Sequence, residues 1–184
     1  MSDIEKIHTG IPELDQVLRG GLPRQRIHLI EGRPGTGKTT IGLRFLIDGA
    51  EKGERCLYIS LSETVEELQA TARSHGWSLD GIDVREVVPA ESQLEHQQSV
   101  LFPSEAELSQ TIGAITDTIQ ERQPVRIVID SMSELRMVAN DPMRYRRQIV
   151  ALKRFLLQLD CTTLLMDDLT DEPRQFDLQG TVHG

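Results

Sequence analysis

The chain is poor in cysteine, in long apolar runs and in positive charge, and each shortage excludes a class of protein. Its 184 residues include two cysteines, Cys56 and Cys161. Both lie in apolar, strand-like runs, so reduced core cysteines are expected rather than a disulfide or a zinc site. No apolar run approaches the roughly 20 residues of a membrane helix, and the N-terminal "MSDIEKIHTG" is too polar for a secretory signal. We therefore expect a cytoplasmic protein.

Basic residues are outnumbered by acidic ones. Lys and Arg total 20 and Asp and Glu total 29, which gives a formal charge of -9 at pH 7. An acidic chain is not broadly attracted to nucleic acid or to an anionic membrane, so neither is expected as a partner. A chain of this length with 38% hydrophobic and 27% charged residues suits a single globular domain with a sizeable core.

One short stretch carries a specific chemical signal. Residues 32–39 read "GRPGTGKT", which fits the phosphate-binding loop pattern GxxxxGK[ST]. The loop needs glycine where a Cβ would keep backbone amides from an anion or where φ turns positive, and Gly35 and Gly37 meet that need. Lys38 is expected to reach the outer phosphates. The hydroxyl of Thr39 is expected to take one coordination place on Mg²⁺.

The flanking sequence places this loop between a strand and a helix. Residues 26–32 read as a short buried strand, and residues 38–54 carry Ile41, Phe45 and Leu46 at helical spacing. Further strands are expected at 55–61, 84–88, 125–130 and 161–168, and further helices at 63–76, 104–122 and 141–160. This alternation predicts an α/β fold with a mainly parallel sheet covered on both faces. Residues 89–103 are expected to form a surface loop.

Ligands in such sheets bind at the carboxyl ends of the strands, where three acidic positions occur. Asp130 ends the run "VRIVID" and is expected to orient the Mg²⁺ shell near Thr39. Glu63 follows the strand at 55–61, where it either activates a water in line with the γ-phosphate or is an acidic first-turn residue of the next helix. Spacing does not decide between these two roles. Asp167 and Asp168 end the last strand, where one of them could sense the γ-phosphate through a water, although solvated loop acids are the favoured interpretation.

Three longer segments together resemble one family. The segments "TGIPELDQVLRGGLPRQRIHLIEGRPGTGKTT", "LYISLSETVEELQATARSHGW" and "RIVIDSMSEL" are similar to the ATPase domain of KaiC-like proteins, in the RecA-like branch of the phosphate-loop ATPases. The resemblance runs from Thr9 to about Asp168. It implies one domain over residues 1–184, with an N-terminal segment at 1–25, a nucleotide-binding core at 26–168 and a tail at 169–184.

The resemblance also implies ligands and an assembly. ATP and Mg²⁺ are the expected cofactors, with Lys38 and Glu63 as catalytic residues, Thr39 and Asp130 at the metal, and Ser74 on the adenosine side. The expected nucleotide-binding residues are Gly32, Gly35, Thr36, Gly37, Lys38, Thr39, Thr40 and Ser74. Relatives form hexameric rings that hydrolyse ATP slowly between subunits, and some phosphorylate their own Ser or Thr. A regulatory domain with a signalling or clock-type protein partner is therefore expected.

Two departures from the family pattern leave the activity open. The clock members carry paired glutamates where this chain has Ser62 and Glu63. If the first position supplies the base, activity should be low, and if the second does, Glu63 suffices. The tail stops at "DLQGTVHG", where the family continues to a basic segment that reaches a neighbour's site, so we expect incomplete final strands, weaker hydrolysis and possible loss of the ring. One alternative is a nucleotide-dependent interaction module with little hydrolysis.

The other alternative is a RecA-like or RadA-like DNA-recombination ATPase. Its DNA loops would follow the strands at 125–130 and 161–168 and would be basic or glycine-rich. In this chain the corresponding segments 131–143 and 167–180 are neutral to acidic, which favours the ATPase of the KaiC-like kind.

Overall fold

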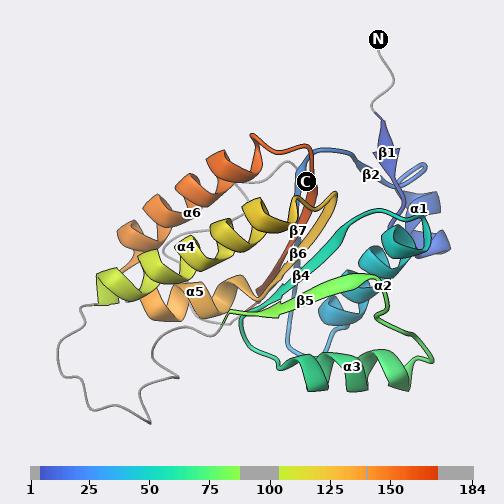
Figure 1. Cartoon of the computed structure of the whole chain (residues 1–184), viewed down its shortest axis with the longest axis horizontal. Coiled ribbons are helices and arrows are strands. Elements are labelled where there is room, and N and C mark those ends of the chain that lie inside the picture. Colours follow the sequence, from blue (N-terminus) through green and yellow to red (C-terminus); the bar gives the residue numbers. More distant parts are fainter. Residues whose placement is uncertain (1–4, 88–103, 140, 170–184) are drawn as a thin grey trace.

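The computed structural model describes residues 5–87, 104–139 and 141–169 (Figure 1). The expected loop at 89–103 and all but the first residue of the 169–184 tail lie outside these ranges. The central feature is a sheet of five parallel strands. In spatial order the strands are β3 (Ile27–Gly32), β7 (Thr162–Asp168), β6 (Arg126–Asp130), β4 (Cys56–Ser60) and β5 (Ile82–Glu86). The predicted parallel α/β architecture is confirmed.

Helices cover both faces of this sheet (Figure 1). One face carries α4 (Ser104–Arg122), α5 (Met132–Ala139) and α6 (Pro142–Leu156), and the other carries α2 (Lys38–Glu51) and α3 (Val65–Ser74). The N-terminal segment adds a hairpin of β1 (Lys6–Ile7) and β2 (Leu22–Pro23), with α1 (Pro12–Val17) between the two strands. None of the described helices is both long and apolar enough to span a membrane.

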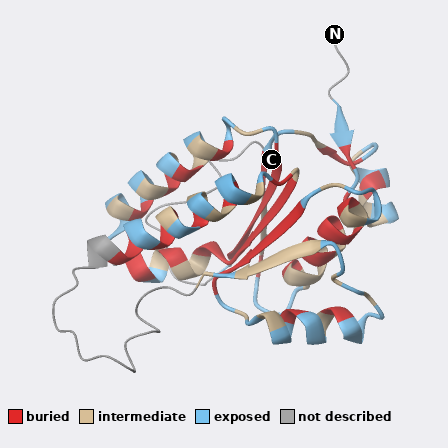
Figure 2. Ribbon diagram, in the orientation of Figure 1, coloured by how far each residue is buried: buried red, intermediate tan, exposed pale blue. Residues whose placement is uncertain are grey.

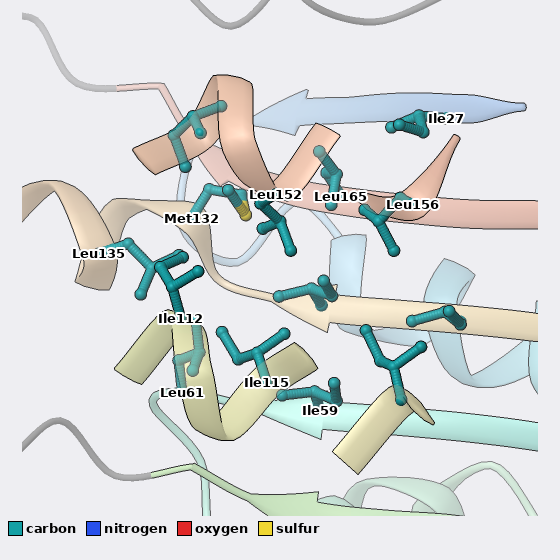
Figure 3. Close-up of a cluster of buried hydrophobic side chains, with 14 of the residues drawn as sticks. Ile27, Ile59, Leu61, Ile112, Ile115, Met132, Leu135, Leu152, Leu156 and Leu165 are labelled. Atoms are coloured by element: carbon teal, nitrogen blue, oxygen red, sulfur yellow. The ribbon is translucent and has the colours of Figure 1, made fainter. Parts of the chain in front are cut away.

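The central strands are apolar along their length because both of their faces are buried. Successive side chains alternate between the two cores. Leu57 and Ile59 of β4 pack with α4, α5 and α6, whereas Cys56 and Tyr58 pack on the α2 side. Figure 2 shows the central strands buried and the edge strand β5 only partly covered. Figure 3 shows the first core, where strand residues such as Ile59 meet helix residues such as Ile115.

The segment after β6, where the DNA-recombination alternative would place a DNA loop, contains a helix that the sequence did not predict, α5, followed by the predicted α6. Met132, Leu135 and Val138 recur at three-residue spacing and are buried against the first core. A helix of eight residues is too short to be stable alone, and its packing on the sheet stabilises it. A helix packed on the sheet here gives no further support to the DNA-loop alternative.

Arg126, the first residue of β6, ties the N-terminal segment to the core. Its side chain is 1% exposed. It pairs with Asp48 at 2.9 Å and Glu54 at 2.5 Å, and it donates to the carbonyl oxygens of His8 and Phe45 at 2.9 and 2.7 Å. A buried guanidinium is tolerated when its donors are satisfied in this way.

Gly49 lies directly against this arginine. A Cβ built on Gly49 would stand 2.6 Å from both Cδ and Nε of Arg126 and 2.7 Å from Sγ of Cys56. The two cysteines are buried and free, as expected.

Candidate functional site

The strand order brings three chain segments together at the carboxyl edge of the sheet. Strand β7 lies between β3, which leads into the phosphate loop, and β6, which ends at Asp130. Asp168 is the register partner of Gly32, and Ser60 is the partner of Asp130. The loop and the acidic strand ends therefore share one edge, as the fold class requires for a ligand site.

The phosphate loop leaves room for an anion above the first turn of α2. Gly35 and Gly37 have φ angles of 79° and 90°, which favour glycine, and a Cβ on either would meet no described atom within 4 Å. Gly37 is the N-cap of α2 and provides no side chain to cover the first amides. The free amides and the helix dipole of a 14-residue helix together attract a negatively charged group. The neighbouring Thr36 hydroxyl donates to the carbonyl of Arg33 at 2.8 Å.

Lys38 is folded down beneath this loop. Its Nζ atom donates to the carbonyl oxygens of Gly32 and Arg33 at 3.0 and 3.1 Å, and it forms an ion pair with Oδ1 of Asp168 at 2.7 Å. The Lys38 side chain is 9% exposed. Its ammonium group thus reaches the end of β7, beside the open cup of the loop.

Thr39 and Asp130 meet across the site. The Thr39 hydroxyl donates to Oδ2 of Asp130 at 2.8 Å, and the buried Tyr58 hydroxyl donates to the same oxygen at 2.7 Å. Burial raises the pKa of Tyr58, and the neighbouring Asp130 carboxylate raises it further. The phenol therefore stays protonated and keeps Asp130 oriented. Thr40 follows in the first turn of α2, partly buried.

Glu63 precedes α3 and is not part of its first turn. Thr64 is the N-cap, in a capping box with Glu67, so the helix starts at Val65. The first-turn role considered for Glu63 is therefore filled by Glu66 and Glu67.

The backbone of Glu63 is held by hydrogen bonds, but one oxygen of its carboxylate is not, within the described part of the chain. The Ser60 hydroxyl donates to its backbone carbonyl at 2.5 Å and accepts from its amide at 3.0 Å, which fixes the Glu63 backbone. Among the described residues, its Oε2 atom is buried without a hydrogen-bond partner. Burial raises the pKa of Glu63, and the charges of Asp130 and Glu67 raise it further. A carboxylate in this setting can accept a proton from a nearby water.

The two acids that end β7 are not solvated loop acids. Asp167 is buried at 0% exposure and pairs with Arg136 of α5 at 2.5 Å. Asp168 pairs with Lys38 and accepts a hydrogen bond from the Ser133 hydroxyl at 3.0 Å. The expectation failed because β7 extends through both residues and α5 packs beside them.

Among the described residues, no recorded hydrogen bond joins the Ser74 side chain to the phosphate loop. It is the last residue of α3, is exposed, and donates to the carbonyl of Thr71 at 2.7 Å. Helix α3 has 10 residues and rises about 1.5 Å per residue, so Ser74 lies roughly 15 Å from the end nearest Glu63. Its expected contact with adenosine remains a prediction.

The donor set fits Mg²⁺ held together with a nucleotide. The described residues contain no group of three or more His, Cys, Asp or Glu side chains arranged for a metal. Mg²⁺ with a nucleotide needs fewer protein ligands, because waters and phosphate oxygens complete its shell. A threonine hydroxyl 2.8 Å from an aspartate oxygen has the chemistry of such a site.

Sequence reasoning missed Tyr58 and Ser133 as members of this site. Tyr58 reaches Asp130 because β4 and β6 are neighbours in register, and Ser133 reaches Asp168 because α5 packs on β7. The signals available in the sequence were a hydroxyl near the carboxyl end of β4 and another just after the carboxyl end of β6. Spacing alone does not say which strands are neighbours.

Comparisons of the sequence with family models and with known proteins both find matches over nearly the whole chain. A family model described as "ATPase: KaiC" matches residues 7–183. A UPF0273 protein of Methanopyrus kandleri is 29% identical over 187 residues, which cover 98% of this chain and 73% of the relative. A UPF0273 protein of Thermotoga maritima is 29% identical over 188 residues, covering 98% and 77%. One from Pyrococcus furiosus is 26% identical over 188 residues, covering 98% and 75%.

Proposed function

Because this chain belongs to the KaiC family of ATPases, we propose that it binds ATP with Mg²⁺ at the phosphate loop and hydrolyses it slowly. The observation that carries the proposal is the contact of Thr39 with Asp130, 2.8 Å long, beside a loop where a Cβ on Gly35 or Gly37 would meet no described atom within 4 Å. A hydroxyl and a carboxylate side by side next to an anion-binding loop are the groups that would hold a metal ion beside bound phosphates.

Each group has a task that follows from its chemistry. The amides around Gly35 and Gly37 bind phosphate oxygens, and Lys38 neutralises the outer phosphates. Thr39 and Asp130 hold Mg²⁺, which supplies positive charge to the phosphates when it is bound. The Tyr58 hydroxyl keeps the Asp130 carboxylate aimed at this position.

Glu63 is the proposed general base. In hydrolysis a water oxygen forms a bond to the γ-phosphorus, the bond from that phosphorus to the β–γ bridging oxygen breaks, and its electron pair stays on ADP. The proton released by the water passes to the Glu63 carboxylate. An unpartnered oxygen and a raised pKa make Glu63 a better base than an ordinary exposed glutamate. Ser62 stands where the clock members have a second glutamate, so Glu63 is the one carboxylate of that pair left to accept the proton.

Two substitutions with matched controls test the proposal. Lys38→Ala should abolish ATP binding in calorimetry, whereas Lys52→Ala, on the exposed end of the same helix segment, should bind like the parent chain. Glu63→Gln should bind ATP but lose phosphate release, with Glu66→Gln as the control in the first turn of α3. Unchanged turnover in Glu63→Gln would remove this residue from the mechanism, and full ATP binding by Lys38→Ala would remove the site. Transfer to a Ser or Thr of the chain instead of water would appear as a mass increase of the intact protein.

We also propose that nucleotide binding drives self-association. Met137 of α5 and Met143 of α6 are 63% and 62% exposed, and an assembly that covered these side chains would gain by burying their apolar surface. Light scattering with and without ATP-Mg²⁺ tests this proposal. A mass that rises with nucleotide supports it, and a monomer that binds ATP without any change in mass contradicts it.

A further inference from the structure

We propose that Asp168 is a positioning residue that holds the Lys38 ammonium away from the space above the phosphate loop. ATP then binds by replacing the Lys38–Asp168 ion pair with an ion pair between Lys38 and a phosphate. This inference rests on the proposed function, because the exchange needs a polyphosphate ligand. It adds a residue outside the loop motif that sets how tightly the loop binds nucleotide.

The first support is that all three N–H donors of Lys38 have acceptors. Two go to the carbonyl oxygens of Gly32 and Arg33 and the third goes to Asp168, the shortest of the three at 2.7 Å. For Lys38 to contact a phosphate, at least one of these bonds has to break. The charged partner is the costly one to lose, because both members of the Lys38–Asp168 contact carry a charge, whereas the two carbonyl oxygens are neutral acceptors.

The second support is that the Asp168 carboxylate is itself held in place. Gly32 and Asp168 are register partners in adjacent strands, and the amide of Leu169 donates to the Gly32 carbonyl at 3.0 Å. The Ser133 hydroxyl donates to Oδ2, leaving Oδ1 toward Lys38. The carboxylate is thus fixed on both sides and does not turn away easily when the lysine moves.

The third support is the charge that remains after the exchange. Burial alone would raise the pKa of Asp168, but hydrogen bonds from Lys38 and Ser133 lower it below its usual value. The nearby Asp168 charge also contributes to a raised pKa of Glu134, after burial. A polyphosphate that takes Lys38 therefore leaves a fixed negative charge near its own oxygens, which weakens binding.

Calorimetric titration of ATP-Mg²⁺ into four variants of the full chain tests the inference. Asp168→Asn keeps the shape but removes the charge, and it should lower the dissociation constant by about tenfold, the change expected for a partly exposed charged pair. Ser133→Ala should lower it less. Asp168→Glu keeps the charge and should stay near the parent value. Asp160→Asn, an exposed aspartate before the other end of β7, controls for net charge and should change nothing.

Melting temperatures separate this role from a purely structural one. Without nucleotide, Asp168→Asn should melt at a lower temperature than the parent, because the ion pair is lost. Saturating ATP-Mg²⁺ should nevertheless raise its melting temperature by more than that of the parent. A structural defect would lower both melting temperatures. Unchanged or weaker ATP binding by Asp168→Asn, with normal binding by the parent, overturns this inference alone. If neither the parent nor any variant binds ATP, the proposed function fails and the inference fails with it.

Discussion

Two glycines inside helices should respond in opposite directions to the same substitution. Gly49 lies in α2 against Arg126, and Gly113 lies in α4, where an added Cβ would meet no described atom within 4 Å. In both helices alanine removes the conformational cost of glycine, which is worth about 0.5–1 kcal/mol. Gly113→Ala should therefore stabilise the fold by roughly that amount.

At Gly49 the packing cost exceeds this gain. The new methyl group would stand 2.6 Å from Arg126, whose guanidinium cannot retreat without leaving Asp48, Glu54 and two carbonyl oxygens. Overpacking a filled interior costs about 1–3 kcal/mol, and a strained buried ion pair adds to it. We expect Gly49→Ala to lose about 2–3 kcal/mol net, or roughly 5–10 °C in melting temperature for a chain of this size.

Chemical denaturation followed by circular dichroism measures both variants against the parent. The parent chain and the two variants should show the same slope with denaturant, so that the midpoints compare stability directly. A Gly49→Ala midpoint equal to or above that of the parent would refute the reasoning, because it would mean that Arg126 is free to move. A destabilised Gly113→Ala would show that the space beside α4 is filled.

Further predictions concern Tyr58, which contacts Asp130, and Glu63. Tyr58→Phe removes a buried hydrogen bond to Asp130 and should cost about 1 kcal/mol in stability, while raising the Mg²⁺ concentration needed for tight ATP binding in a calorimetric titration. Equal Mg²⁺ requirements in variant and parent would contradict the role given to Tyr58. The raised pKa of Glu63 means that the folded chain holds this proton more tightly than the unfolded chain, so stability falls as pH rises from about 4.5 through the folded value. Glu63→Gln should therefore melt higher than the parent at pH 7 but not at pH 4; a difference independent of pH would exclude this cause. Turnover of the parent should decline as pH falls through the same pKa, measured as phosphate release.

Much of the fold could be predicted from the sequence because its central strands are uniformly apolar and are separated by long helices. The strand expected at 125–130 is observed as Arg126–Asp130, and the one expected at 161–168 as Thr162–Asp168. Short elements were harder, as α5 illustrates: its eight residues include two charges and a serine, and packing on the sheet stabilises it.

The site was predicted as far as its parts follow from local sequence. The phosphate loop is contiguous, so its glycines and Lys38 could be assigned from the motif. The position of Asp168 beside Lys38 depends on β7 lying next to β3, and the Tyr58 contact depends on the register of β4 with β6. The spacing of residues along the chain does not predict which of these strands are adjacent. The start of α3 was ambiguous until the Thr64 capping box excluded Glu63 from the first turn.

Strand β6 carries a structural anchor at one end and a reactive carboxylate at the other. Arg126 begins the strand, and Asp130 ends it. Four steps of about 3.3 Å each separate the two by roughly 13 Å. The melting temperature then reports on the Arg126 end of the strand, and ATP binding at the proposed site reports on the Asp130 end. Damage to the scaffold and damage to the chemistry can then be followed in the same sample by two independent signals.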